Sequence, residues 1–183
     1  MGNDCGINEK TVRAWISVLE ASYIVFLLYP YYRNLGRRLV KSPKLYFVDT
    51  GLACSFLHIN SEEQLINHPL RGSLIETFLI SDLLKQQYNL ERMPSLYFWR
   101  DHSGHEVDCI IEQSLEPVAV EIKASKTVIP SFFKEINFWR DVTNFKKFPG
   151  YIIYGGSENQ RWQENRVISW KSAGTLIRNI EQY

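Results

Sequence analysis

The fold is decided by the stretch GHEVDCIIEQSLEPVAVEIK, residues 104–123. This stretch predicts two consecutive strands, residues 106–112 and 117–124, because β-branched and other apolar residues alternate in it with charged ones. Successive side chains of a strand point to opposite faces. We therefore expect Glu121 and Lys123 to share one face of the second strand, with the neighbouring valines and isoleucine on the other face.

The first of these two strands carries several carboxylates. If its alternation is regular, one face holds Ile110 together with the acidic residues Glu106, Asp108 and Glu112. The opposite face then consists of Val107, Cys109 and Ile111. Two adjacent strands are thus expected to project carboxylates from an otherwise apolar framework.

Carboxylates on neighbouring strands are suited to binding a divalent metal. Mg²⁺ and Mn²⁺ prefer hard oxygen ligands, commonly one or two carboxylates with water and substrate phosphate. We predict that Asp108 and Glu121 bind the metal, and that Lys123 positions the nucleophile or offsets negative charge in the transition state. The alternative is an ordinary strand face on which Glu121 and Lys123 form only an ion pair.

A further acidic residue, Glu76, lies on a helix predicted from about residue 70 to residue 87. Apolar residues follow it at helical spacing, so its side chain is expected on the apolar face of the helix. A buried carboxylate is costly unless it is paired or bound to a metal. Glu76 is therefore either the partner of a cation such as Arg71, or a further acid at the same metal site.

The elements around these motifs follow an α/β order. A strand at residues 96–100 precedes the two acidic strands, and an amphipathic helix opening at Pro130 follows them. Further strands are expected at residues 151–154 and 167–170, before a closing helix at residues 174–181. The order from the long helix onward is therefore helix, three strands, helix, strand.

The N-terminal region has the pattern of a partial winged helix. Asn8 is expected to cap a helix with a buried apolar stripe, which strands at residues 23–29 and 44–48 follow. A complete winged helix needs two more helices before its recognition helix. We interpret residues 1–60 as a partial winged helix from a longer protein and residues 61–183 as a second domain.

Basic residues in the N-terminal region are candidates for DNA binding. Phosphate contacts need clustered Lys and Arg, and the segment 33–44 carries five cations and no acid. The candidate contacts, including two on the first helix, are Lys10, Arg13, Arg33, Arg37, Arg38, Lys41 and Lys44. The alternative is a solvated basic loop or a docking surface for a protein module.

Composition excludes several classes of protein. The chain has 183 residues, of which 45% are apolar, and a formal net charge of +1, so it can form a core and is not disordered. Its three cysteines contain no CxxC pair, which argues against a disulfide framework or a zinc site. The longest apolar stretch, residues 23–32, is shorter than the roughly 20 residues of a membrane helix. With no visible signal peptide, we expect a cytoplasmic protein without a membrane partner.

The acidic motifs resemble those of the PD-(D/E)XK nuclease superfamily, which has a restriction-endonuclease-like fold. The resemblance covers about residues 71–156 and implies a core of helix, three-stranded meander, helix and strand. It implies that Asp108 is the acid of the second core strand, and that Glu121 and Lys123 are the E-x-K of the third. Glu76 corresponds to the helical acid that many members carry.

A second resemblance covers nearly the whole chain. The motifs YYRN (31–34), SPKLYFVDTGL (42–52) and GHEVD (104–108) resemble the C-terminal region of prokaryotic AAA-type ATPases of unknown function. In that family a P-loop ATPase module precedes a winged helix and a nuclease-like domain. This sequence contains no G-x-x-x-x-G-K-[ST] motif, so ATP binding would belong to a further N-terminal module.

Together the residues and the resemblance predict an α/β protein with a PD-(D/E)XK core and a partial winged helix. The predicted function is metal-dependent phosphodiester hydrolysis on DNA, with Mg or Mn as cofactor and an attached AAA-type ATPase module as partner. Assembly of the full-length protein into a homo-oligomer is left open. The rival interpretation is a catalytically silent module that binds DNA or protein and regulates the attached ATPase.

Overall fold

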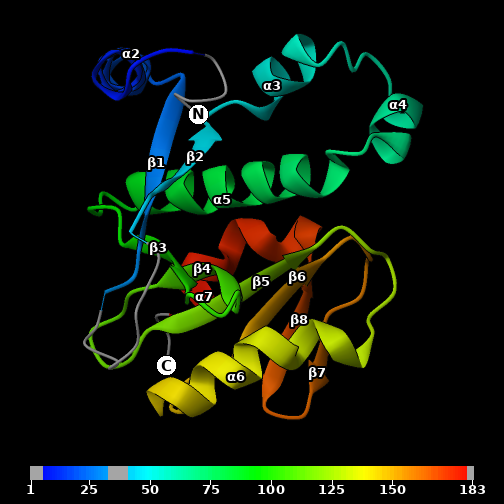
Figure 1. The fold of residues 1–183 in the computed structure, drawn as a ribbon. Coiled ribbons are helices and arrows are strands. Elements are labelled where there is room, and N and C mark those ends of the chain that lie inside the picture. Colours follow the sequence, from blue (N-terminus) through cyan, green and yellow to red (C-terminus); the bar gives the residue numbers. More distant parts are fainter. Residues whose placement is uncertain (1–5, 33–40, 181–183) are drawn as a thin grey trace.

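One mixed sheet with helices on both faces forms the framework of the protein (Figure 1). It is seen in a computed structural model that describes residues 6–32 and 41–180. In this part of the chain the sheet has eight strands in the order β2-β1-β3-β4-β5-β6-β8-β7. Their bounds are β1 (Val25–Pro30), β2 (Lys44–Phe47), β3 (Leu96–Arg100), β4 (Glu106–Ile111), β5 (Val118–Lys123), β6 (Tyr151–Tyr154), β7 (Gln160–Trp162) and β8 (Asn165–Ser169).

The helices begin where the sequence supplies capping side chains. Asn8, Asp49 and Ser61 each accept a hydrogen bond from a backbone N–H in the first turn, and the helix start predicted at Asn8 is thereby confirmed. The α-helices are α2 (Glu9–Ala21), α3 (Thr50–Phe56), α4 (Glu62–Asn67), α5 (Arg71–Asn89), α6 (Lys134–Thr143) and α7 (Leu176–Ile180). Two 3₁₀ turns, η1 (Pro130–Phe133) and η2 (Trp170–Thr175), precede α6 and α7.

The central strands have the predicted connectivity. β3, β4 and β5 form an antiparallel meander, and β6 then pairs in parallel with β5. With α5 before the meander and α6 after it, the predicted order of helix, three strands, helix and strand is confirmed. The short strand β7, which pairs with β8 in a hairpin, was not predicted.

A β-bulge in β4 changes which residues share a face. The register of β3 and β4 shifts by one residue, so that both Asp108 and Cys109 lie opposite Phe98. The extra residue reverses the alternation: Val107 and Ile110 pack on the α6 face, whereas Cys109 packs on the α5 face. The regular alternation predicted for this strand is therefore wrong, because one inserted residue moves the side chains that follow it to the other face.

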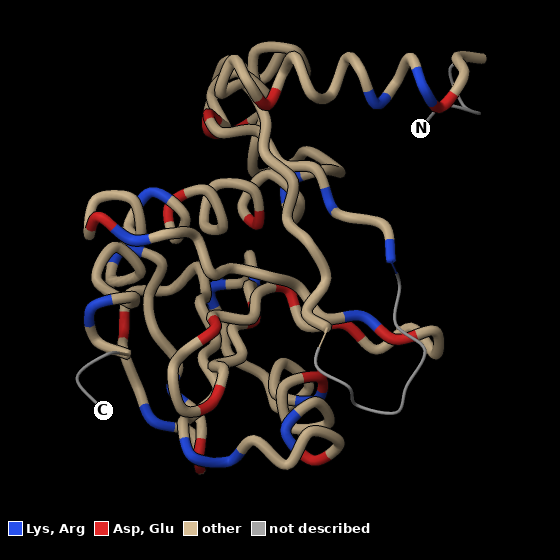
Figure 2. Tube along the Cα trace, turned by 90° about the vertical axis from the view of Figure 1, so that its left-hand side faces the viewer, with Lys and Arg blue, Asp and Glu red and all other residues tan. Residues whose placement is uncertain are grey.

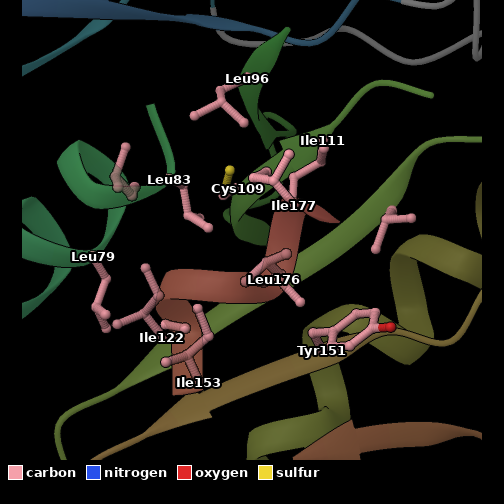
Figure 3. Close-up of a cluster of buried hydrophobic side chains, with 14 of the residues drawn as sticks. Leu79, Leu83, Leu96, Cys109, Ile111, Ile122, Tyr151, Ile153, Leu176 and Ile177 are labelled. Atoms are coloured by element: carbon pink, nitrogen blue, oxygen red, sulfur yellow. The ribbon is translucent and has the colours of Figure 1, made fainter. Parts of the chain in front are cut away.

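Apolar layers cover both faces of the sheet. On one face α5 and α7 pack against the central strands, and Figure 3 shows their side chains directed toward one another. On the other face η1 and α6 supply Phe133, Ile136 and Trp139, which pack with Ala119 and Ile152 of the sheet. β5 lies between these layers, so any charged side chain on it must find its partner inside the protein.

The N-terminal strands belong to the same sheet as the rest. β1 pairs antiparallel with β2 and parallel with β3, where Tyr29 lies opposite Tyr97. The stripe predicted on α2 is only half-buried at Val12, Ile16 and Leu19. The boundary predicted after residue 60 stays a prediction, and hydrogen bonding in the sheet continues across it.

Charged residues are distributed over the whole trace. Lys and Arg segments alternate with Asp and Glu segments along the described chain (Figure 2), in keeping with the formal net charge of +1. Among the residues that the structure describes, none of the helices combines the length and the apolar character needed to cross a bilayer.

Replacing Leu28 tests whether β1 unfolds together with the central sheet. Leu28 is 2% exposed and packs into the α5-face layer. Leu28→Ala should lower the free energy of unfolding by about 2–5 kcal/mol in urea denaturation, because it leaves a cavity. The control Leu115→Ala, at a residue 57% exposed, should change it by less than about 0.5 kcal/mol. A Leu28→Ala protein with the wild-type midpoint, or with two separate transitions, would contradict a single cooperative sheet.

Candidate functional site

Charged side chains from four elements meet where β4 and β5 separate. The ladder between these strands runs from the Cys109–Val120 pair to the Ile111–Val118 pair, so the strands diverge beyond Cys109. We call the charged groups around this fork the acidic cluster: Glu76, Glu106, Asp108 and Glu121, with Lys44 and Lys123. Asp108, Glu121 and Lys123, which were predicted to form the core of the metal site, all belong to the acidic cluster.

Asp108 is held by the bulge and by the neighbouring strand. The backbone N–H of Ile122 donates a hydrogen bond of 2.8 Å to Asp108 Oδ2. Burial raises the pKa of the Asp108 carboxyl well above its usual value, and the negative charges of Glu121 and Glu76 raise it further. The hydrogen bond from Ile122 and the charge of Lys123 oppose this shift without cancelling it. Asp108 is thus a carboxyl group in a site with an excess of negative charge.

Glu121 is the most deeply buried acid of the cluster. Its residue is 4% exposed, and burial raises the pKa of its carboxyl group although Lys123 opposes the shift. Lys123 Nζ donates to Glu121 Oε1 at 2.6 Å. Glu121 Oε2 is buried and has no hydrogen-bond partner among the described residues. A buried carboxylate oxygen without a partner is costly, and it is the type of atom that a metal ion binds.

Lys123 acts as a cation at this position. Burial lowers the pKa of its ammonium, but the carboxylates of Glu121 and Asp108 outweigh this effect, so the pKa lies above its ordinary value. Lys123 is therefore protonated at neutral pH and has no lone pair to accept a proton. Both roles predicted for it, positioning the nucleophile by donating a hydrogen bond and offsetting negative charge, fit this state.

Glu76 is paired with residues of β2. Lys44 Nζ lies 3.1 Å from Glu76 Oε1 and also contacts Glu106, and the Tyr46 hydroxyl donates to the same Glu76 oxygen. Glu76 was predicted to pair with Arg71 or another cation if it was not a metal ligand. Arg71 instead donates to the carbonyl oxygen of Ala124 at 3.0 Å, and Lys44 takes the place of the cation.

On the α6 side of the sheet, a second pair borders the cluster. Glu135 lies in the first turn of α6, and its negative charge is one cause of the raised pKa of Glu121. His105 Nδ1 lies 2.8 Å from Glu135 Oε2, and the His105 ring stacks on Phe138 at 3.7 Å between centroids. Glu135 and Tyr46 were missed by sequence reasoning, since no spacing in the chain links them to the acidic strands.

The donor set fits a partly hydrated divalent ion. Within residues 6–32 and 41–180 no group of three His, Cys, Asp or Glu side chains is arranged to hold a metal. Mg²⁺, however, commonly takes only one or two carboxylates from a protein and keeps several waters. Asp108 and Glu121 supply two, and the unpartnered Glu121 Oε2 is one free ligand atom.

The predicted DNA contacts that the structure describes do not form one group. Lys10 and Lys41 are exposed, and Arg13 makes an ion pair with Glu9 on α2. Lys44 lies in the acidic cluster with its ammonium already paired to carboxylates, rather than on a free basic surface. The other predicted contacts, Arg33, Arg37 and Arg38, lie outside the described residues.

The stability of the protein should depend on the charge of Asp108. Because the pKa of Asp108 is raised in the folded state, the folded protein binds the proton more tightly than the unfolded chain does. The free energy of unfolding should therefore fall as the pH rises from the ordinary carboxyl pKa to above the raised pKa of Asp108. Asp108→Asn, which mimics the neutral form, should raise the free energy of unfolding at pH 7 by about 0.5–2 kcal/mol. Urea denaturation from pH 4 to pH 8 measures both effects.

Glu63→Gln, at an exposed position of α4, is the control for loss of a carboxylate. It should leave the pH dependence of stability as it is in the wild type. An Asp108→Asn protein that is less stable than the wild type at pH 7 would contradict an excess of negative charge around Asp108.

Comparison with known proteins places the chain in a family. Residues 71–173 match the domain of unknown function DUF4143, and residues 1–63 are similar to the domain of unknown function DUF8612. Uncharacterized proteins of Mycobacterium tuberculosis and Mycobacterium bovis are each 32% identical over 121 residues, which is 66% of this chain and 26% of the relative. The chain thus spans about a quarter of the length of these curated relatives. Because the match at residues 71–173 covers more than half of the chain, the protein belongs to the DUF4143 family.

Proposed function

We propose that this domain hydrolyses phosphodiester bonds of DNA with Mg²⁺ or Mn²⁺, on a fold of the PD-(D/E)XK type. The observation that carries the proposal is the buried carboxylate of Glu121 beside Asp108, whose Oε2 has no hydrogen-bond partner in the described part of the chain. The order α5-β3-β4-β5-α6-β6 supports it, since the superfamily has the same order of elements in its core.

Asp108 and Glu121 would hold the metal. When bound, it would polarise the phosphoryl oxygen and lower the pKa of a coordinated water. Its charge would also relieve the repulsion that raises the pKa of Asp108. Because carboxylates bind metal in their ionised form, affinity should rise with pH until both groups have lost their protons.

The remaining residues of the cluster would act through charge and position. Lys123, protonated and next to Glu121, is placed to offset negative charge that develops on a phosphoryl group. The Glu76 oxygen accepts hydrogen bonds from Lys44 and Tyr46, so we assign it a positioning role at the edge of the site. Its charge helps to set the pKa of Asp108 without a direct contact to substrate.

The second candidate function is a silent module that binds DNA or protein and regulates an attached ATPase. It is favoured by the absence, among the described residues, of a three-ligand metal group. The resemblance to AAA-type ATPases supports a P-loop module elsewhere in such proteins and a partial winged helix in residues 1–60 of this chain. In this alternative the Glu121–Lys123 pair would serve only to stabilise the sheet.

Cleavage of plasmid DNA separates the two candidates. The wild type should nick supercoiled DNA in Mn²⁺ or Mg²⁺. Asp108→Asn and Glu121→Gln should reduce the rate at least about 100-fold, since the loss even of an outer-shell partner of a metal site costs about 10–100-fold. Lys123→Met should reduce it about 10²–10³-fold, as for other groups that stabilise transition-state charge.

Lys126→Met, at an exposed position near the end of β5, is the matched control and should keep the wild-type rate. Equal rates for the wild type and Asp108→Asn would mean that cleavage comes from a contaminant. Absence of cleavage by the wild type in either metal would favour the silent module.

A further inference from the structure

Arg71, at the start of α5, is a cation without a carboxylate partner among the described residues. Its side chain is half-buried, and within the described part of the chain its guanidinium makes one hydrogen bond, to the carbonyl oxygen of Ala124 at 3.0 Å. A guanidinium has five N–H donors, so most of the hydrogen-bonding capacity of Arg71 stays open. The chemistry proposed for the acidic cluster does not use this charge.

The two lysines of the acidic cluster differ from Arg71 in this respect. Lys44 Nζ lies 3.1 Å from a carboxylate oxygen of Glu76, and Lys123 Nζ lies 2.6 Å from a carboxylate oxygen of Glu121. Both ammonium groups therefore have a negatively charged partner within the protein. Arg71 is held by a neutral carbonyl oxygen instead, so its charge remains available to an anion from outside the chain.

Two elements place Arg71 beside the acidic cluster. On the side of the sheet, its partner Ala124 follows directly after Lys123, and consecutive Cα atoms are about 3.8 Å apart. On the side of the helix, Glu76 comes five residues after Arg71 in α5, which is about 7.5 Å along the helix axis. The guanidinium therefore lies where β5 ends, at the border of the cluster.

The backbone that anchors Arg71 is itself fixed. Gly155, directly after β6, donates its N–H to the carbonyl oxygen of Ser125 at 2.9 Å. A Cβ atom at Gly155 would lie 2.8 Å from the carbonyl oxygen of Ala124, so only glycine allows this close approach. The Ser125 hydroxyl accepts from the N–H of Thr127 at 3.1 Å and donates to its carbonyl oxygen at 2.9 Å. A side chain held on such a segment loses less conformational freedom when it binds a ligand.

The chemistry of a guanidinium selects the anion. Its planar arrangement of donors matches the oxygens of phosphate or carboxylate. In the proposed function the anion is the backbone of a nucleic acid, in which a strand whose scissile phosphate meets the metal has further phosphates on either side. Contacts to such phosphates fix the register of the strand and do not read its bases.

We propose that Arg71 binds a backbone phosphate next to the scissile phosphate and so positions the strand on the acidic cluster. The inference rests on the proposed function, because the identity of the anion comes from it. Arg71 would contact the substrate in the ground state and in the transition state alike. Its loss should therefore affect KM more than kcat.

DNA binding without cleavage tests this contact first. The probe is a fluorescently labelled oligonucleotide, followed by anisotropy at several salt concentrations, and the protein carries Asp108→Asn so that the probe is not consumed. Adding Arg71→Gln should weaken binding about tenfold and reduce the slope of log affinity against log salt by about 1. Arg71→Lys keeps the charge and should retain the slope. Arg71→Met is a second neutral variant and should behave like Arg71→Gln.

Cleavage of the same oligonucleotide by proteins that retain Asp108 gives the second readout. Arg71→Gln should raise KM about tenfold and change kcat by less than about threefold, because the interaction that it removes does not depend on the transition state. The matched control is Arg178→Gln, at an exposed position of α7. The neighbouring Ile177 bonds to Gln86, near the opposite end of α5 from Arg71. This control should keep the wild-type slope and KM.

The outcomes separate the two proposals. If both neutral variants of Arg71 show the slope and KM of Arg178→Gln, the assignment of Arg71 is overturned and the nuclease stands. An equal loss of slope in Arg71→Lys would trace the effect to the bond with Ala124 and would also overturn it, as would the absence of oligonucleotide binding. A slope that depends on Arg71, with no cleavage by the wild type in Mg²⁺ or Mn²⁺, would support the phosphate contact and refute hydrolysis alone.

Discussion

The structure of the candidate site depends on one inserted residue in β4. The bulge opposite Phe98 displaces Asp108 from regular alternation at the place where β4 and β5 separate. Asp108 is then fixed by the N–H of Ile122, close enough to Glu121 for the negative charge of Glu121 to raise the pKa of Asp108. The bulge therefore lies beside the site, while the apolar residues of both strands support the core.

Bringing several carboxylates together in a half-buried place is unfavourable, and the surrounding elements partly compensate for it. Lys44 from β2 pairs with Glu76 and Glu106, and Lys123 pairs with Glu121. The pKa of Asp108 nevertheless stays raised, and one oxygen of Glu121 stays without a partner among the described residues. This residual imbalance distinguishes the cluster from a fully satisfied ion-pair network and is the physical reason to expect a cation or substrate there.

Most elements could be predicted from the sequence because they rest on local signals. The capping residue Asn8 predicted a helix start, and apolar runs between turns predicted most of the strands. The bulge could not be predicted, since a period of two in the sequence does not reveal an extra residue that only the pairing with β3 creates. Lys44 was assigned to a basic surface for a similar reason. The sequence shows that it belongs to a cationic segment, but its pairing with Glu76 depends on how β2 joins the sheet. Glu135 likewise acquires its neighbours His105 and Glu121 only through the packing of α6.

The central claim is that Asp108 and Glu121 form a site for a divalent ion. Calorimetric titration of Mn²⁺ into the protein at pH 7, beside Asp108→Ala, tests it most directly. The account predicts saturable binding of one ion to the wild type, with proton release that reflects the raised pKa of Asp108, and loss of that binding in the variant. Absence of saturable binding at millimolar Mn²⁺, or equal binding by Asp108→Ala, would contradict it.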